Sequence, residues 1–254
     1  MKGKSVCNKS GGTKRDIASV ICQRGPPPFI SNNRSSCYGK MTEKTISERV
    51  ENNLLFLYLV SEASKAGRVE DDLKAQKLVF LSQKRLVQKK LKAFNYTFLR
   101  WHKGPFSKDL ANDIKALVKA GMLTRINNEI ALTDAGKEIA ARCEELLTKQ
   151  PEFMAQIKAV AQLYGAIPSD DLKEKVYDIS VWVPRLKKVM KIRDVEEKQL
   201  ILYGLSAKKA RKSFNLDENW QATLELVFDK QALDSLKMAQ QDAVEGRICD
   251  FNAL

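Results

Sequence analysis

Histidine, paired cysteines and long apolar runs are what this chain of 254 residues has little of. Its one histidine, His102, argues against a histidine triad and against a histidine-rich metal site. The five cysteines contain no Cys-x-x-Cys pair, so we expect no metal, no disulfide framework and a reducing, cytoplasmic location. The longest apolar run, 54–60, is too short to cross a membrane, and the N-terminus lacks the apolar core of a signal peptide.

No catalytic constellation can be read from the remaining polar residues either. A catalytic histidine needs a nucleophile and an orienting acid, and neither lies at a readable spacing from His102. We therefore expect a protein that is not an enzyme, with no catalytic residues and no cofactor.

What the sequence does have is positive charge, with 44 lysines and arginines against 31 acids and a net charge of +13. Such a surface favours nucleic acid or an acidic protein as a partner, although the same charge can serve only to keep a protein in solution. The charge is uneven, because residues 217–254 hold eight acids and only three bases. A basic body with an acidic end suggests two different tasks.

Composition divides the chain into three parts. Residues 1–40 are rich in glycine, serine, asparagine and proline and lack helical periodicity, so we expect a disordered basic extension. A helix-start pattern follows Met41 at once, which suggests Met41 as the natural start; the alternative is a basic arm that tracks phosphates. We expect a helical domain over 41–213 and an acidic, amphipathic, partner-binding tail over 214–254.

Apolar periodicity predicts a mainly α fold with a short strand and a small β-hairpin. Ser47 is a candidate cap for the first helix, which should end near Gly67. The expected helices span 47–67, 69–90, 108–120, 134–149, 151–164, a segment from 168, 178–193, 194–213, 217–228 and 230–245. The expected strand covers 94–101, and the hairpin covers 122–132 with a two-residue turn at Asn127 and Asn128.

The succession of helix 108–120, hairpin 122–132 and a further helix is typical of a winged-helix unit. In that arrangement a helix enters a DNA groove and the hairpin touches the backbone, so basic residues bind phosphate and asparagines reach a base edge or a phosphate. The alternative is that the unit only packs or binds protein. The predicted DNA-binding residues are Lys108, Asn112, Lys115, Lys119, Arg125, Asn127 and Asn128.

The acidic tail carries more apolar side chains than a segment of its length can bury within itself. These side chains require a surface, which is either the body of this protein or the groove of a partner. The predicted partner-binding residues are Trp220, Leu224, Phe228, Leu233 and Leu236.

Two parts of the chain, the region 46–180 and the C-terminal tail, resemble known families. Residues 73–80 (LKAQKLVF), 98–107 (FLRWHKGPFS) and 163–177, which begin LYGAIP, are similar to the Panacea domain of antitoxins and phage-associated proteins, over about 46–180. Lys103 stands where that family usually has an aromatic residue before Gly-Pro. The tail resembles the toxin-neutralising tails of prevent-host-death-type antitoxins.

Together the two resemblances imply the antitoxin of a type II toxin–antitoxin pair. Such a protein binds a protein toxin encoded nearby and represses transcription from its own promoter by binding the promoter DNA. We expect no membrane partner. The alternative is a stand-alone winged-helix transcription regulator whose tail forms a homodimer.

Overall fold

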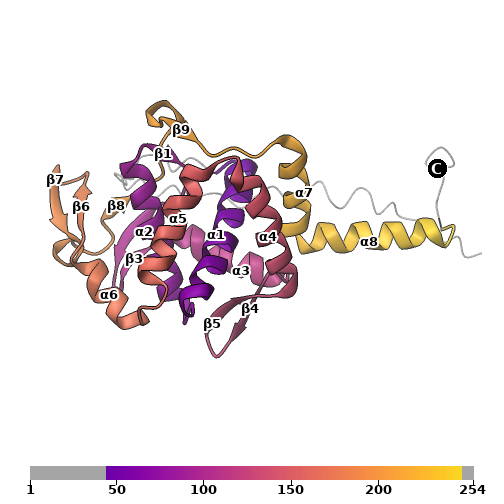
Figure 1. Ribbon diagram of the computed structural model, residues 1–254, viewed down its shortest axis with the longest axis horizontal. Coiled ribbons are helices and arrows are strands. Elements are labelled where there is room, and N and C mark those ends of the chain that lie inside the picture. The colour runs from indigo at the N-terminus through magenta and orange to yellow at the C-terminus, as the bar shows by residue number, and fades with distance from the viewer. Residues whose placement is uncertain (1–43, 248–254) are drawn as a thin grey trace, which may run out of the picture. The chain divides into compact units, whose positions relative to one another are not determined.

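The computed structural model describes residues 44–247, apart from the side chains at positions 143, 145 and 147. The chain divides into two units, Met1–Thr42 and Glu43–Leu254, and the description below applies to the second. The predicted disordered extension over 1–40 and the predicted start at Met41 lie outside the described residues. The mainly α fold class is confirmed, since small separate sheets accompany a body of helices (Figure 1).

The helices are α1 (Ile46–Ala66), α2 (Asp72–Gln88), α3 (Lys108–Lys119), α4 (Asp134–Thr148), α5 (Pro151–Tyr164), α6 (Ser169–Tyr177), α7 (Glu218–Phe228) and α8 (Lys230–Val244), with 3-10 turns η2 (Ile192–Asp194) and η3 (Ala207–Lys209). The strands are β1 (Leu91–Lys92), β2 (Phe98–Trp101), β3 (Gly104–Phe106), β4 (Leu123–Ile126), β5 (Glu129–Leu132), β6 (Ser180–Val183), β7 (Lys188–Lys191), β8 (Leu200–Leu202) and β9 (Lys212–Ser213).

Helix α1 is the centre of the body. Every residue from Val50 to Val60 is buried, because α2, α4, α5 and α7 pack around this helix (Figure 1). A helix that is apolar on all sides belongs inside a protein rather than on its surface. The sequence run 54–60, too short for a membrane, is therefore the middle of the core.

The helix starts follow local capping chemistry. Thr45 begins α1 in a capping box, in which its side chain accepts from the Glu48 amide and the Glu48 carboxylate accepts from the Thr45 amide. The prediction of Ser47 as the cap was therefore wrong by two residues, because only Thr45 has a glutamate three residues later. Asp217 and Asp229 cap α7 and α8 in the same side-chain-to-backbone manner.

The strands tie distant parts of the chain to the helices. Strand β2 pairs antiparallel with both β3 and β8, and β1 pairs in parallel with β9. The strand predicted over 94–101 is shorter in the structure, because only Phe98–Trp101 pairs, and Gly104–Phe106 forms the adjoining strand β3. The three strands β3, β2 and β8 join residues about one hundred positions apart in sequence.

The helices predicted over 178–193 and 194–213 are wrong. This stretch forms the β6–β7 hairpin, strands β8 and β9, and two 3-10 turns. The physical reason is a period of two at Val181, Trp182 and Val183, whose side chains are buried, exposed and buried, followed by Pro184, which cannot continue a helix. Valine and tryptophan also favour strands over helices.

The predicted boundary before residue 214 also needs correction. Phe214 is 2% exposed, its ring meets Phe153 edge to face, and its amide donates to the Lys92 carbonyl oxygen. Helix α7 then packs against α1, whereas α8 leaves the body without a buried residue (Figure 1). The tail is therefore two elements of different character, and only the second is free of the core.

Within residues 44–247, no helix combines the length and the hydropathy needed to cross a membrane.

Candidate nucleic-acid interface

Helix α3 has one buried and one exposed side. Leu110, Ile114 and Leu117 are fully buried and hold the helix against the core. The opposite side presents four of the predicted DNA-binding residues in a row at spacings of four, three and four: Lys108, Asn112, Lys115 and Lys119. These four residues, all exposed, are called the α3 stripe below. Within the described part of the chain, none of its three lysines has an ion-pair or hydrogen-bond partner.

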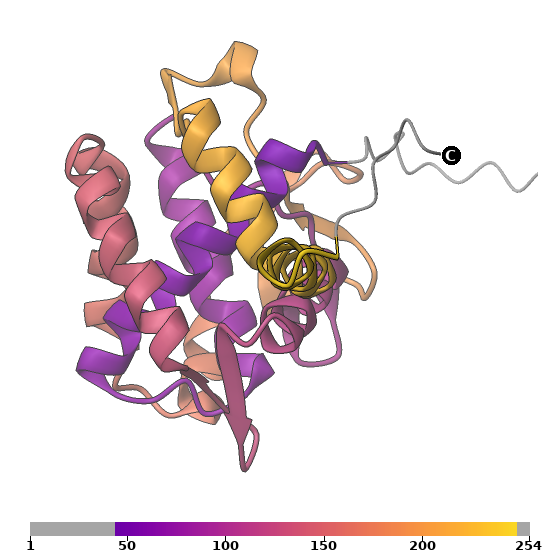
Figure 2. The ribbon, with the colours of Figure 1, turned by 90° about the vertical axis from the view of Figure 1, so that its right-hand side faces the viewer.

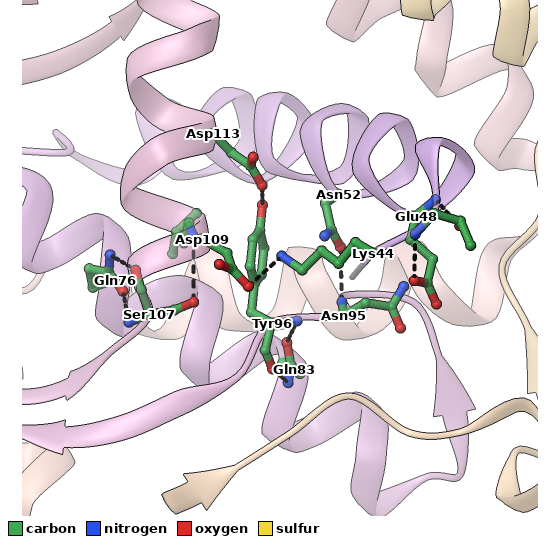
Figure 3. Close-up of polar contacts among 12 residues, drawn as sticks. Lys44, Glu48, Asn52, Gln76, Gln83, Asn95, Tyr96, Ser107, Asp109 and Asp113 are labelled. Carbon is green, nitrogen blue, oxygen red and sulfur yellow. Dashed lines mark hydrogen bonds and ion pairs between the residues drawn. The ribbon is translucent and has the colours of Figure 1, made fainter. Parts of the chain in front are cut away.

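Both acids of α3 are engaged away from the stripe. Asp109 pairs with Lys44 at 3.2 Å, and Asp113 accepts a hydrogen bond of 2.9 Å from the Tyr96 hydroxyl (Figure 3). Burial raises the pKa of Asp113 above its ordinary value, while Lys44 and the Tyr96 hydroxyl act in the opposite direction. Because the acids bind these partners, the charge that α3 offers to solvent is positive.

The start of α3 is fixed by a glutamine of α2. The Gln76 side-chain amide donates to the Ser107 carbonyl oxygen at 3.0 Å and accepts from the Ser107 amide at 2.9 Å (Figure 3). Ser107 in turn caps α3 through the Leu110 amide. Gln83, two turns further along α2, makes the same pair of bonds with the Tyr96 backbone. Sequence reasoning missed both glutamines, although their spacing of seven placed them on one face of a predicted helix.

The β4–β5 hairpin forms around the predicted two-residue turn, with Leu123 opposite Leu132 and Arg125 opposite Ile130. Asn127 and Asn128 form its exposed turn with φ values of 51° and 71°, the left-handed conformation that asparagine tolerates. A left-handed Gly121, with φ of 76°, joins α3 directly to β4. The hairpin therefore projects from the C-terminal end of α3 (Figure 2).

Arg125, predicted to bind DNA phosphate, is instead paired with a carboxylate of the protein. Its Nη2 atom lies 2.8 Å from Oδ1 and 3.1 Å from Oδ2 of Asp72, at the start of α2. This exposed ion pair links the hairpin to the start of α2 and engages the Arg125 guanidinium, while the α3 stripe and the two asparagines remain exposed.

One backbone bridge adds a third strand position to the hairpin. Val69, between α1 and α2, pairs antiparallel with Ile130, and the Ile130 amide donates to the Val69 carbonyl oxygen at 2.8 Å. The order along the chain is therefore helix, bridge, helix, helix, hairpin, with residues 89–107 inserted before α3.

The predicted partner-binding residues of the tail do not form one surface. Leu224 is 1% exposed, and Trp220 and Phe228 are partly buried against the same core. On α8, Leu233 is half-buried and Leu236 is 42% exposed. The α7 residues are thus occupied by the protein's own body, and the α8 residues are available.

Lys77, on α2, is a buried cation that belongs to none of the surfaces described above. Its side chain is 0% exposed, and its Nζ atom has no hydrogen-bond partner in the described residues. A Cβ atom at Gly104, which has φ of 96°, would lie 3.9 Å from that Nζ. Burial lowers the pKa of Lys77 to about 7, against the opposing influence of Asp71.

Comparison with known proteins gives no match for this chain, whether with protein-family models, with curated protein sequences or with solved structures.

Proposed function

We propose that the protein is an autoregulating antitoxin, in which one surface binds promoter DNA and another binds a protein toxin. The DNA surface has the stronger geometric support. It is carried by one observation: three exposed lysines, which have no ion-pair partner among residues 44–247, line the outer side of α3, and a hairpin with an asparagine turn follows that helix directly.

The order of elements supports a winged-helix interpretation of this surface. A winged-helix domain places a third helix in the major groove and a β-wing beside it. Here α1, α2 and α3 supply the helices, β4 and β5 supply the wing, and the Val69–Ile130 bridge supplies the strand between the first two helices. The +13 net charge favours the same class of partner.

The test is binding of duplex DNA from the region upstream of the gene at several salt concentrations. Lys115→Glu with Lys119→Glu should weaken binding and lower the slope of log affinity against log salt by about one unit for each phosphate that the variant no longer binds. Lys149→Glu with Lys230→Glu makes the same change in net charge at exposed positions outside the stripe and serves as the control. Equal loss of affinity in both double variants would rule out the stripe as the DNA-binding surface.

The toxin surface is supported by α8. This helix of 15 residues has no buried residue. Ala232, Leu236, Ala239 and Ala243 follow each other at spacings of four, three and four, and therefore share one face. An amphipathic helix with an unpartnered apolar face is a common means of occupying a groove on another protein. The resemblance of the tail to antitoxin tails and of residues 46–180 to the Panacea domain supports the same assignment.

This second surface is tested by co-expression with the protein of the neighbouring reading frame. Leu236→Glu should abolish co-purification of that protein with this chain. It should also abolish the ability of this chain to restore growth to cells that express that protein. Met238→Glu, on the opposite side of the same helix and 67% exposed, is the matched control and should have no effect. If the tail instead joins two copies of a stand-alone regulator, Leu236→Glu converts a dimer to a monomer in light scattering and no neighbouring protein co-purifies.

A further inference from the structure

The β6–β7 hairpin concentrates exposed apolar and cationic side chains more than any function assigned above requires. Val181 and Val183 are buried at 4% and 0% exposure, so one face of the hairpin is anchored in the body. The outward face carries Trp182, 53% exposed, directly opposite Val189, 63% exposed. Figure 1 shows this hairpin at the end of the described unit opposite to α8.

The charge of the hairpin is of one sign. Residues 183–193 contain five cations and no acid. Lys191 and Arg193 share Asp178, at 3.3 Å and 2.9 Å. The other three, Arg185, Lys187 and Lys188, are exposed and have no ion-pair partner among residues 44–247. Arg185 and Lys187 lie in the turn that joins Val183 to Lys188, one pair of residues beyond the Trp182–Val189 pair, whereas Lys188 pairs with Val183 and belongs to the anchored face.

We propose that the β6–β7 hairpin is a binding surface for single-stranded nucleic acid, with Trp182 stacking on a base and Arg185 and Lys187 of the turn contacting the phosphates. An aromatic ring on an outward sheet face beside a cationic track is the combination that binds unpaired strands without sequence preference. A duplex does not offer the faces of its bases, so an exposed stacking ring is of most use on a single strand.

Two other classes of partner fit the hairpin less well. The exposed apolar side chains of the hairpin are Trp182, Leu186 and Val189, whereas a stable protein interface takes roughly 20–30 residues from each side. An interfacial membrane anchor needs an apolar face that extends along a whole helix or is supplemented by a lipid chain. Three apolar side chains within a cationic ribbon match one or two bases and their phosphates more closely.

The test measures the affinity of the full chain for a 20-nucleotide oligo-dT and for oligo-rU, by anisotropy. Trp182→Ala should lower the affinity by about tenfold or more, the effect of losing one stacked base, and Trp182→Phe should restore most of it. Arg185→Glu with Lys187→Glu should abolish binding and the salt dependence with it. Leu163→Ala, which removes a side chain 58% exposed on α5, is the control and should bind as the original chain does.

This surface is independent of the α3 stripe, and the experiment separates the two. Lys115→Glu with Lys119→Glu should leave oligo-dT binding intact, and Trp182→Ala should leave duplex binding intact. The proposal is overturned if Trp182→Ala binds oligo-dT and oligo-rU as tightly as Leu163→Ala does. It is also overturned if neither oligonucleotide binds, whereas vesicles with anionic lipid do so through Trp182. Unequal affinity for the two oligonucleotides identifies DNA or RNA as the natural strand.

Discussion

At the scale of single residues, the core contains two ionisable groups that oppose folding at neutral pH. Lys77 and Glu51 are both buried, and burial brings the pKa of each to about 7, from 10.5 and 4.5 respectively. A group that loses water on folding favours its neutral form. Since one is a base and the other an acid, the two respond to pH in opposite directions.

Lys77→Met is expected to stabilise the protein at pH 7, by about 1–3 kcal/mol, the usual penalty of a buried donor without a partner. Because the pKa of Lys77 is lower in the folded chain, the contribution of its neutral amine to stability is complete above pH 10.5 and is lost as the pH falls to about 7. Urea unfolding from pH 6.5 to 10 should therefore show a rise in stability that Lys77→Met removes. Lys175→Met, at an exposed position on α6, should preserve the rise.

Glu51→Gln is expected to stabilise the protein at pH 8 and to have little effect at pH 4. The pKa of Glu51 is higher in the folded chain, so its contribution is complete below pH 4.5 and is lost as the pH rises through about 7. Thermal unfolding of this variant between pH 4.5 and 7.5 should lack the decline seen in the original chain. The exposed Glu196→Gln should follow the original curve, and a decline that survives in Glu51→Gln would assign it to another group.

At the scale of elements, most helices could be predicted and the strands mostly could not. The helix starts at Pro151, Ser169 and Asp217 depend on local signals, and the β4–β5 turn depends on its two asparagines, so neighbouring residues suffice. Strands β1, β8 and β9 are two or three residues long and exist only because partners far along the chain meet them. Such pairing leaves no periodicity to detect.

The site was predictable to a similar extent. That the residues of the α3 stripe share one exposed side follows from helical spacing alone, whereas their contact with DNA stays a prediction. The engagement of Arg125 by Asp72 joins residues 53 positions apart and could not be foreseen. The docking of α7 depended on whether the body offers a surface to Leu224, which no pattern within the tail reveals.

Loss of the α7 anchor and loss of α8 should have different effects on stability. Leu224→Ala empties a fully buried position and should destabilise the protein by about 2–5 kcal/mol. A chain that ends at Asp229 keeps α7 and the residue that caps its C-terminal end, and lacks α8. It should unfold at nearly the same temperature as the full chain, because α8 buries no residue. Differential scanning calorimetry of both variants checks this. A large loss of stability on removing α8 would show that α8 packs on the body.

At the scale of the whole molecule, the described unit has a fully buried central helix, and the three surfaces proposed to bind partners lie at its periphery. Helix α1 contacts α2, α4, α5 and α7, and its buried polar groups are partly bonded across to the chain after α2, as in the Asn52 side-chain oxygen that accepts from the Asn95 amide (Figure 3). The α3 stripe, most of α8 and the outward face of the β6–β7 hairpin are exposed. Binding of the proposed partners at one of these surfaces would therefore require no rearrangement of the core.

Hydrogen exchange should report this distribution of stability. The α1 residues from Val50 to Val60 are all buried by the helices that pack around them. Their amides should therefore exchange only when the whole unit unfolds. Amides of α8 should exchange through local opening at a rate that denaturant scarcely changes, since an isolated helix of 15 residues is marginal in water. Addition of the neighbouring-frame protein should slow exchange in α8 and leave α1 unchanged. Protection of α8 equal to that of α1 in the free chain would mean that α8 is already covered by a second copy, and dilution would then restore its fast exchange.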